Sequence, residues 1–389
     1  MGTLPRLDIL LYAHDGRGIG HAGRTIAIGI ALRRLAPRLR VLFVSGCRLT
    51  RELIGSAPLD WVKLPSYETI VQNGTSRGIQ GKSNFSDHDL GVLRAEQIHA
   101  LVSTVQPRLV LADHSPQGKH RELLPALQRT KTSQTQWILG VRGIVGQVDK
   151  LCSTVALSIF AAYYSDLLWY GDSRVLGTGP LLELGQRFST KPLECGYVSR
   201  LKAQGISNQP THRKNSGVTV SIPWIGEKTP AFLQHLYTVL NKVEDRWGQW
   251  ILYLDQTHQD SNRFSERFES LPWCHVEEPG ERYRESLLGS DYAVIYGGYN
   301  SIMDVLSVSV PALVILRDMR DGEQQEHLER LLHTASGTLI PVPEDCSQNE
   351  LQDALEKLTV QKNRFSATIN LDGADNAAKF LIDRLKTAS

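Results

Sequence analysis

Short apolar runs alternate with segments of helical spacing along the first half of the chain. An apolar run covers residues 7–12, and residues 21–35 follow it with apolar side chains at helical intervals. Further apolar runs cover 41–44, 109–112 and 137–141. Strands that alternate with helices in this way predict a parallel sheet with helices on both faces.

The same alternation starts again in the second half. Apolar runs predict strands at 218–222, 250–254, 292–296 and 312–316. Helical spacing predicts helices over 229–247, from Ser301, from Gln324 and, as an amphipathic C-terminal helix, over 374–385. Two α/β units in succession are therefore expected.

The length of the chain favours the same division into two domains. It has 389 residues, whereas a single hydrophobic core usually stops growing at roughly 250–300 residues. A polar stretch with glycine and proline at 199–216 is typical of a linker. We predict an N-terminal domain at 1–198, a C-terminal domain at 217–372 and a helix at 373–389 that packs back on the N-terminal domain.

One segment breaks the alternation. Residues 69–89 are rich in Gly, Ser, Asn and Gln and have few apolar side chains. This composition predicts a long loop, which is either an acceptor loop near the active site or a plain disordered insertion. The composition favours neither alternative.

The two halves differ in charge, although the whole chain has a formal net charge of only +2. Residues 1–198 hold 23 Lys and Arg against 15 Asp and Glu, and the remainder holds 20 against 26. A basic first half suits an anionic acceptor or a membrane surface. Because the basic residues are scattered rather than in a run, the pattern favours a chance excess of solvated surface arginines.

The cysteines and the hydropathy indicate a cytoplasmic protein. The five cysteines form no C-x-x-C pair, which argues against a disulfide framework and a thiolate zinc site. No signal peptide is visible, and the longest apolar stretch, 155–164, predicts a buried helix because it is far shorter than the ~20 residues that span a bilayer. We expect no transmembrane segment and no nucleic-acid partner, while peripheral membrane contact stays compatible with the sequence.

A glycine-rich loop at 16–21 follows the first strand and opens the first helix. Glycines let backbone N–H groups approach a ligand closely, and a helix N-terminus favours phosphate. A dinucleotide site also needs an acid at the end of the second strand, but residues 44–47 contain none, which disfavours nicotinamide binding. His21, at the mouth of the sheet, is a candidate base near neutral pH.

Two polar turns in the second half have the same position relative to their strands. The turn at 296–301 is again strand, Gly-Gly and helix, with Ser301 placed to bond a phosphate or to cap the helix. Asp304 lies one turn into that helix, close enough to reach the ribose of a bound nucleotide. The polar stretch 317–325 follows the next strand and so lies at the ligand edge of the sheet.

These motifs together resemble the predicted glycosyltransferases related to family 28. That group includes the enzyme that adds N-acetylglucosamine to the lipid-linked peptidoglycan precursor. The resemblance covers most of the chain and is carried by 12–24, 111–116, 170–172, 196–198 and, most specifically, 296–311.

The resemblance implies an α/β GT-B fold, in which two Rossmann-like domains with parallel sheets face each other across a cleft. It implies a UDP- or dTDP-sugar donor on the C-terminal domain, a small-molecule or lipid-linked acceptor on the N-terminal domain, and inversion at the anomeric carbon. It also implies that the enzyme needs no metal and no cofactor. The expected donor-binding residues are Gly297, Gly298, Tyr299, Asn300, Ser301, Asp304, Arg317, Glu323, Gln324 and Gln325, and the expected acceptor or phosphate loop contains Gly18, Gly20 and Arg24.

An inverting transfer needs a base that takes the proton of the acceptor hydroxyl. We assign this role to His21, with Asp113 as the other candidate, because each follows or ends a predicted strand at the carboxyl edge. Gly298, Asn300 and Ser301 would hold the diphosphate, and Gln324 and Gln325 would contact the sugar.

One departure from the family pattern leaves other functions open. Relatives often carry a Gly-Gly-Gly turn after the first strand of the second domain, where this chain has Pro223-Trp224. Proline removes an N–H donor and tryptophan adds bulk, which weakens the expected diphosphate contact. The alternatives are a nucleotide-sugar 2-epimerase, which would convert donor without an acceptor, and a non-catalytic GT-B protein, which would bind nucleotide or a partner without turnover.

Overall fold

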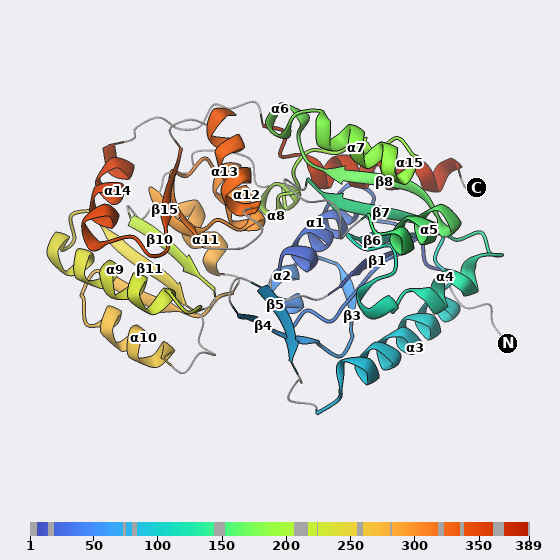
Figure 1. The fold of residues 1–389 in the computed structure, drawn as a ribbon, viewed down its shortest axis with the longest axis horizontal. Helices are drawn as coiled ribbons and strands as arrows, with labels where there is room; N and C mark the ends of the chain where they lie inside the picture. Colours follow the sequence, from blue (N-terminus) through green and yellow to red (C-terminus); the bar gives the residue numbers. More distant parts are fainter. Residues whose placement is uncertain are drawn as a thin grey trace. The chain divides into compact units, whose positions relative to one another are not determined.

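The computed structural model describes residues 6–14, 19–72, 75–79, 84–143, 152–205, 217–223, 225–254, 260–280, 282–317, 323–334, 338–360 and 369–387. The chain divides into two compact units (Figure 1). Unit 1 consists of Met1–Gly205 with Ile369–Ser389, and unit 2 consists of Ile206–Thr368.

Unit 1 is built on a seven-stranded parallel sheet. Its strands follow the spatial order β3-β2-β1-β6-β7-β8-β9. The bounds are β1 Ile9–Ala13, β2 Val41–Ser45, β3 Asp60–Lys63, β6 Leu109–Asp113, β7 Gln136–Arg142, β8 Tyr164–Tyr170 and β9 Leu193–Glu194. All residues of β1 and β6 are buried, as their continuous apolar runs require for strands covered on both faces.

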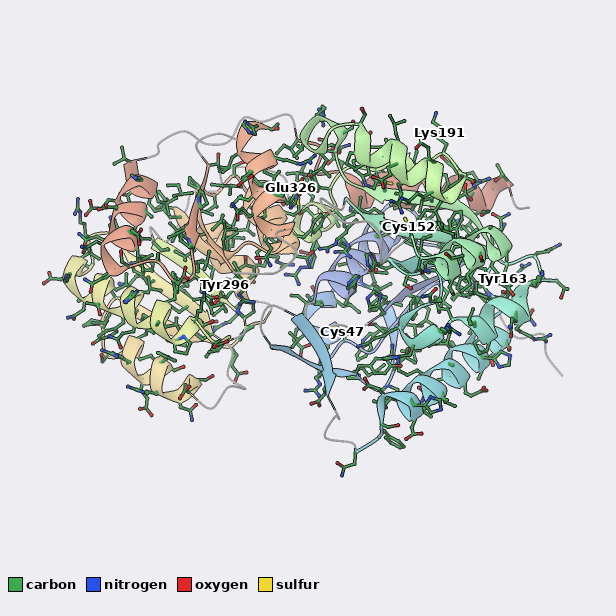
Figure 2. All side chains as sticks on the ribbon, in the orientation of Figure 1. Cys47, Cys152, Tyr163, Lys191, Tyr296 and Glu326 are labelled. Carbon is green, nitrogen blue, oxygen red and sulfur yellow. The ribbon has the colours of Figure 1, made fainter. Side chains whose placement is uncertain are left out.

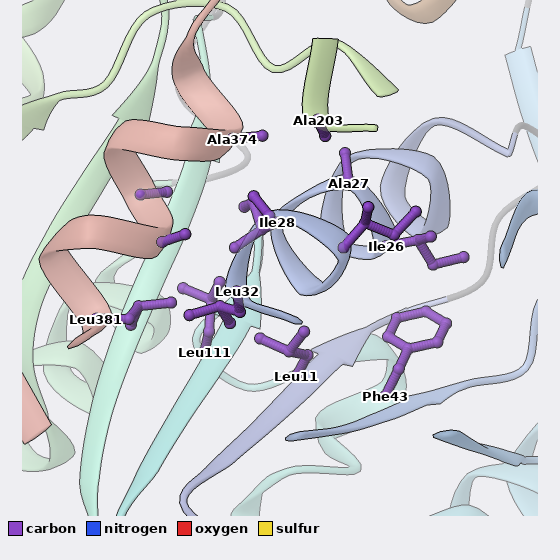
Figure 3. Packing of buried hydrophobic residues seen from close by; sticks show 14 of the residues in the cluster. Leu11, Ile26, Ala27, Ile28, Leu32, Phe43, Leu111, Ala203, Ala374 and Leu381 are labelled. Atoms are coloured by element: carbon purple, nitrogen blue, oxygen red, sulfur yellow. The ribbon is translucent and has the colours of Figure 1, made fainter. Parts of the chain in front are cut away.

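Helices cover both faces of this sheet (Figure 1). They are α1 Gly20–Leu35, α2 Thr50–Ile54, α3 Asp87–Val105, α4 Leu124–Thr130, α5 Thr154–Tyr163, α6 Ser173–Leu176, α7 Gly179–Phe188, α8 Arg200–Ala203 and α15 Gly373–Thr387, with a 3-10 turn at Lys119–Arg121. Helix α1 buries Ile26, Ile28 and Leu32 in a core that it shares with β1, β2, β6 and α15 (Figure 3).

Helix α15 belongs to the core of unit 1 although it is the last element of the chain. Ala374, Ala378 and Leu381 are at most 1% exposed and pack in the same cluster as α1 (Figure 3). The chain entering α15 is held by backbone bonds, because Gly373 N–H donates to Tyr197 O at 3.0 Å. The position of the helix that carries His21 therefore depends on the C-terminal residues.

The segment predicted as a loop over 69–89 contains regular structure, so that prediction is wrong. Strands β4 (Glu68–Gln72) and β5 (Thr75–Ile79) pair antiparallel, and α3 begins at Asp87. The Ser86 hydroxyl caps α3 by accepting the Asp89 N–H at 3.1 Å. These two strands pair through their backbones although their sequences lack the apolar pattern of the other strands. The Asn-Gly dipeptide at 73–74 in the sequence is a known hairpin signal that the analysis of composition did not use.

The range predicted as a linker is partly folded into unit 1. Residues 200–203 form α8, where Leu201 is 1% exposed and Ala203 is fully buried. Residues 206–216 lie outside the described residues. Leu201 and Ala203 are the apolar side chains that dock this short helix, and the otherwise polar composition of the range conceals them.

Unit 2 repeats the architecture with a six-stranded parallel sheet of order β12-β11-β10-β13-β14-β15. Its strands are β10 Gly217–Ile222, β11 Gln249–Leu254, β12 Cys274–Glu277, β13 Tyr292–Tyr296, β14 Ala312–Leu316 and β15 Leu339–Pro343. Its helices are α9 Thr229–Val243, α10 Ser261–Glu269, α11 Arg282–Gly289, α12 Tyr299–Ser307, α13 Glu323–Thr334 and α14 Gln348–Val360. The core gathers around Trp250, Phe232 and Phe268, all fully buried.

The structure also bears on the cysteines and on possible membrane-spanning helices. All five cysteines are buried and described, and none of them forms a disulfide; Cys47 and Cys152 are marked in Figure 2. Within the described ranges, no helix has both the length and the apolar character needed to cross a bilayer.

Candidate active site

The sheet of unit 1 has a topological switch between β1 and β6. From β1 the chain builds outward through β2 and β3 on one side, and from β6 through β7, β8 and β9 on the other. Ligands of open α/β sheets bind outside the carboxyl ends of the strands at such a point. Strand β1 is followed there by His14, and β6 ends at Asp113 and is followed by His114.

Three imidazoles and a carboxylate meet at this switch point. His21 lies in the first turn of α1, and its ring centroid is 3.9 Å from that of His14 and 5.2 Å from that of His114. His21 Nδ1 is hydrogen-bonded to Asp113 Oδ2. The sequence offered His21 and Asp113 as alternative bases, whereas the structure joins them in one pair.

The pair fixes the state of the imidazole. A carboxylate only accepts hydrogen bonds, so the proton of neutral His21 lies on Nδ1 and its Nε2 keeps a lone pair. Asp113 is 1% exposed, whereas the side chain of His21 is 23% exposed. The Asp113 carboxylate is therefore shielded from solvent, whereas the His21 imidazole can be reached by a ligand.

Arg24 supplies the charge that Asp113 needs in its buried position. Arg24 is 2% exposed, and its Nη2 lies 3.4 Å from Asp113 Oδ2 and 3.1 Å from His21 Nδ1. Because Nδ1 has one in-plane site and Asp113 occupies it, the guanidinium donates to the carboxylate. Two donors thus hold Asp113, which is the arrangement that orients a base.

The surroundings keep His21 neutral. Burial lowers its pKa well below the usual 6.5, and the positive charges of His14, Arg24, Arg142 and Lys119 lower the pKa further. Burial also lowers the pKa of His114, with contributions from His21 and His14. At neutral pH the Nε2 of His21 is therefore free to accept a proton.

The remaining residues expected in the acceptor loop are only partly described. Gly20 begins α1, and Arg24 lies one turn later with Asp113. Gly18 lies outside the described residues. Of the three, Arg24 is thus the one with a defined role in the geometry.

A buried ion pair behind the site was missed by reasoning from sequence. Arg94 and Glu122 are both fully buried, with Arg94 Nε donating to Glu122 Oε2 at 2.5 Å and Nη2 donating to Oε1 at 2.9 Å. The hydroxyl of Tyr12 also donates to Glu122. This network ties α3 and β1 to the loop between β6 and α4, which carries His114 and Lys119. No local pattern marks the pair, because its partners are 28 residues apart.

His114 carries a signal that sequence reasoning passed over. It has a φ of +69°, which few residues other than glycine adopt. Its backbone N–H donates to Gly140 O at 2.7 Å, which continues the pairing of β6 with β7 beyond the strand end. A histidine directly after a buried strand, as at His14 and His114, is the pattern that would have found both.

Unit 2 has its own switch point, between β10 and β13. Strand β13 ends at Tyr296, and Gly297 and Gly298 lead into α12. Gly298 is the N-cap of α12 without a side-chain cap, and the first turn holds no acid. Backbone N–H groups of this turn are thus oriented as in anion-binding helix starts. Tyr299 is buried, while Asn300 and Ser301 are half-buried at the same end.

Asp304 is 7% exposed, one turn into α12, so its carboxylate belongs to the interior rather than to a solvated surface. The sequence assigns it to a ribose, and that role stays a prediction. Pro223 follows β10 directly, and Trp224 lies outside the described residues.

A hydroxyl and carboxylate network behind this turn was not foreseen. Glu344 is 6% exposed and accepts hydrogen bonds from Thr229 Oγ1 at 2.6 Å and from the Tyr296 hydroxyl at 2.7 Å (Tyr296 is marked in Figure 2). The Arg317 guanidinium lies 3.5 Å from the Tyr296 ring centroid. Burial raises the pKa of the Tyr296 phenol, which therefore stays protonated as a donor. The network joins the ends of β13, β14 and β15 and the start of α9.

The two expected sugar-contacting glutamines have different surroundings. The Oε1 of Gln324 is buried and has no hydrogen-bond partner among the described residues, and a Cβ placed on Gly297 would lie 3.5 Å from it. Gln325 is exposed, donates to Glu329 at 2.9 Å and lines a pocket of about 500 Å³ with Arg317 and Lys228. Gln324 therefore faces the Gly-Gly turn, whereas Gln325 faces the pocket. Nothing is described of the Glu323 side chain.

The imidazole cluster of unit 1 also has the ligand spacing of a metal site. One ligand atom from each of His14, His21 and Asp113 lies within 4.8 Å of the other two. Arg24 Nη2 lies 3.1 Å from His21 Nδ1 and shares Asp113, so a dication there would be opposed by a guanidinium and would compete for the same carboxylate. The sequence expects no metal, and that expectation stays a prediction.

No protein-family model matches the chain, and no match is found among curated proteins. Solved structures are similar to it over nearly its whole length. A UDP-N-acetylglucosamine 2-epimerase from Listeria monocytogenes, itself described as putative, has a TM-score of 0.63 at 13% identity, covering 98% of this chain and 96% of that chain. UGT71G1 of Medicago truncatula, complexed with UDP-glucose, has 0.56 at 11%, covering 97% and 98%.

MurG of Acinetobacter baumannii has a TM-score of 0.53 at 11% identity, covering 98% of this chain and 100% of that chain. At such identities the likeness shows the fold, and the predicted fold class is confirmed. The chain has the GT-B fold, which glycosyltransferases related to family 28 and UDP-N-acetylglucosamine 2-epimerases share.

Proposed function

We propose that the protein is an inverting glycosyltransferase that moves a sugar from a nucleoside-diphosphate donor to a hydroxyl or amine of an acceptor. The observation that carries the proposal is the hydrogen-bonded His21–Asp113 pair at the switch point of unit 1. A neutral imidazole with a free Nε2, oriented by a sealed carboxylate, is the equipment of a general base.

The chemistry divides between the two units. The acceptor proton passes to His21 Nε2, the acceptor oxygen forms a bond to the anomeric carbon, and the bond from that carbon to the diphosphate oxygen breaks. The electron pair leaves on the nucleoside diphosphate. Gly298 and Ser301, at the uncapped start of α12, would stabilise the negative charge of this leaving group.

The donor belongs to unit 2 in this proposal. Asp304 would bond the ribose hydroxyls, and Gln324, with its buried Oε1 near Gly297, would contact the sugar. A UDP- or dTDP-sugar is the expected donor, and the likeness to UGT71G1 complexed with UDP-glucose supports the UDP form. The proposal requires neither a metal nor a cofactor.

The experiment that tests the function is an activity screen with a matched control. The purified protein is incubated with UDP- and dTDP-sugars and a panel of hydroxyl acceptors, and glycosylated product and released nucleoside diphosphate are measured by mass spectrometry. The His21→Ala variant should lose transfer while His88→Ala, which removes an exposed histidine of α3, should keep it. Equal turnover by the two variants would show that the base assignment is wrong.

A 2-epimerase is the second candidate, because a UDP-N-acetylglucosamine 2-epimerase is among the similar folds at a TM-score of 0.63. An epimerase would change the donor sugar at C2 with no acceptor present. Incubation of the protein with donor alone, followed by separation of the 2-epimers, distinguishes the two activities. A non-catalytic protein would bind nucleotide and yield neither product.

A further inference from the structure

The chain leaves β6 through a strained turn at His114. The φ of His114 is +69°, and the Ser115 N–H donates to Asp113 O at 2.9 Å across it. A hydrogen bond between residues two positions apart, closed around a positive φ, defines the rarer of the two γ-turn forms, which is strained. Strained backbones persist where the surrounding structure enforces them, and they cluster at sites that contact ligands. The turn therefore suggests a function for the His114 side chain.

Other left-handed residues of the described ranges have a structural reason that His114 lacks. Gln106 and Ser189 are the C-caps of α3 and α7, and a left-handed residue is a common way to end a helix. His114 follows a strand, so helix termination does not account for its conformation. Glycine would adopt the same φ at lower cost, and so would asparagine. A histidine at this position is thus not explained by the backbone.

The backbone hydrogen bonds around His114 do not need its side chain either. Its N–H donates to Gly140 O at 2.7 Å, and the Ser115 N–H closes the turn. A glycine would form both bonds. The imidazole itself lies in the candidate site, because its ring centroid is 5.2 Å from that of His21 and 5.9 Å from that of His14. The ring is therefore the part of His114 that needs an explanation.

One nitrogen of this ring is enclosed by protein. The Nδ1 of His114 is buried and has no hydrogen-bond partner among the described residues, while the residue as a whole is half-buried. Burial lowers the pKa of His114, so the ring is neutral at neutral pH. Because a buried N–H without an acceptor is rare, the single proton of this neutral ring lies on Nε2. His114 thus offers an Nε2–H donor, whereas His21 offers an Nε2 lone pair.

Two neighbouring imidazoles of opposite hydrogen-bonding character fit a ligand with two oxygens. The hydroxyl that loses its proton donates to His21 Nε2. A donor aimed at the same oxygen would occupy a lone pair that has to attack the anomeric carbon, so the His114 donor suits a second oxygen. Ring centroids 5.2 Å apart bring both Nε2 atoms within reach of oxygens on adjacent carbons of one molecule.

We propose that His114 determines the specificity of the acceptor site by donating a hydrogen bond from its Nε2–H to an oxygen on the carbon next to the hydroxyl that His21 deprotonates. The acceptor class that fits is a vicinal diol, as in a carbohydrate or another polyol. The inference rests on the proposed function and deepens it by naming the acceptor. His114 takes no part in bond making or breaking, and the second oxygen keeps its own proton.

The first measurement locates the proton on each ring. Two-bond ¹⁵N–¹H correlation spectra of the full-length protein with ¹⁵N-labelled histidines distinguish the two tautomers, and single histidine variants assign the signals. At neutral pH, His114 should carry its proton on Nε2 and His21 on Nδ1. A proton on the Nδ1 of His114 would overturn the inference, because the donor would then be enclosed by protein.

The second measurement asks whether the chain keeps the ring at a cost in stability. His114→Gly keeps both backbone hydrogen bonds and relieves the strain, so it should raise the melting temperature by roughly 2–4 °C. His114→Ala lacks the ring but keeps the strain, and should not raise it. A melting temperature of His114→Gly below that of the wild type would show that the ring is a structural support, and the inference would be wrong.

The third measurement compares two probes that differ by one hydroxyl. The vicinal cis-cyclohexanediol and cyclohexanol are titrated in turn with UDP saturating the donor site, and the His21 ring signals report binding. The diol should bind about tenfold more tightly than the alcohol, and His114→Gly should remove this preference. His114→Gln, whose amide N–H can replace the lost donor, should recover part of it.

The matched control is His120→Gly. His120 is an exposed histidine with a φ of +51° in the turn that follows His114, so the same substitution there relieves a similar backbone without removing the proposed contact. This variant should keep the tenfold preference. Equal affinity of the wild type for the two probes, including no binding of either, overturns the inference, and so does a preference that survives in His114→Gly.

Nucleotide binding and transfer in the same samples separate this failure from failure of the function. If UDP raises the melting temperature and lone alcohols are glycosylated as readily as vicinal diols, the transferase stands and the role of His114 is wrong. If the protein neither binds a nucleotide nor transfers a sugar, the proposed function itself is wrong.

Discussion

In unit 1 the strands that flank the switch point lead into His14 and Asp113, whereas in unit 2 the corresponding strands lead into Pro223 and Gly297. The first site is lined by groups that titrate or carry charge, and the second by an uncapped helix start backed by the Tyr296, Thr229 and Glu344 network. Two sheets with the same topology thus present a proton acceptor in one case and a set of neutral donors in the other. The difference teaches that, in the proposed reaction, chemistry belongs to unit 1 and binding of the leaving group to unit 2.

The largest expected effect is a loss of kcat with no change in nucleotide affinity. His21→Ala should lower kcat by about 10²–10⁴-fold, because the general base is lost. Affinity for the nucleotide should stay unchanged, since His21 belongs to unit 1. Steady-state kinetics together with calorimetric titration of UDP measure both. A fall in UDP affinity matching the fall in kcat would contradict the division between the units.

The next effect concerns the support of the first site. Glu122→Gln should destabilise the protein by about 3–5 kcal/mol, because it leaves the fully buried Arg94 guanidinium without its charge partner. The double variant Arg94→Met/Glu122→Leu removes both charges and should be much less destabilised. Urea unfolding followed by tryptophan fluorescence compares them. Equal losses in the two variants would show that the ion pair is not the source of the effect.

The binding site of unit 2 should respond in the opposite sense to the first site. Asp304→Asn should raise the dissociation constant for UDP about tenfold through loss of a charge-assisted hydrogen bond to the ribose, while kcat at saturating donor changes little. Asp245→Asn, at an exposed acid after α9, is the matched control. An unchanged dissociation constant in Asp304→Asn would remove this residue from the donor site.

The pH dependence separates the stability of unit 1 from its activity. The pKa values of His21 and His114 are lowered in the folded protein, chiefly by burial, so between these values and about 6.5 the unfolded chain binds protons that the folded protein does not. The free energy of unfolding should therefore be independent of these groups above about pH 6.5 and fall as pH drops below it. Turnover should persist below pH 6.5, because His21 stays neutral there. The free energy of unfolding from urea titrations and kcat are measured from pH 5 to 8. If kcat fell at a higher pH than the free energy of unfolding as the pH is lowered, the base would have a raised pKa and the prediction would be wrong.

The last prediction is that removing divalent metals has no effect on the transfer rate. Treatment with EDTA should leave the transfer rate unchanged, because Arg24 opposes a dication at His14, His21 and Asp113. Complete loss of activity on chelation, restored by a divalent metal, would show that this cluster binds a metal rather than acting as a general base.

The fold could be predicted from sequence wherever a strand is apolar throughout. The runs that became β1, β6 and β13 were located correctly, and the helix predicted over residues 21–35 is α1, Gly20–Leu35. Strand β3 was missed because most of its side chains are exposed, and the β4–β5 pair was missed because its sequence has few apolar residues. Strand pairing is a long-range property, and a single stretch of sequence does not contain it.

Prediction of the candidate site from sequence has the same limit, because contacts between distant residues are not contained in a local stretch of sequence. Position near a strand end singled out His21 and Asp113 separately, but their pairing depends on β1 lying beside β6, because the two residues are 92 positions apart in the sequence. The Arg94–Glu122 pair has no positional mark at all, since it joins the middle of a helix to a loop. The sequence therefore supplied candidate residues, and the topology determines which of them lie together.

The return of α15 to unit 1 has a consequence for the order in which the protein matures on the ribosome. The apolar face of α1 is completed by Ala374, Ala378 and Leu381, and residues 206–368 are synthesised between the two parts of the unit. At about 5–20 residues per second, translation of that insert takes roughly ten to thirty seconds. At the end of this interval unit 2 has its whole sequence, while the helix that carries His21 still lacks a neighbour. The sequence of the half that would bind the donor is therefore complete before that of the half that would perform catalysis.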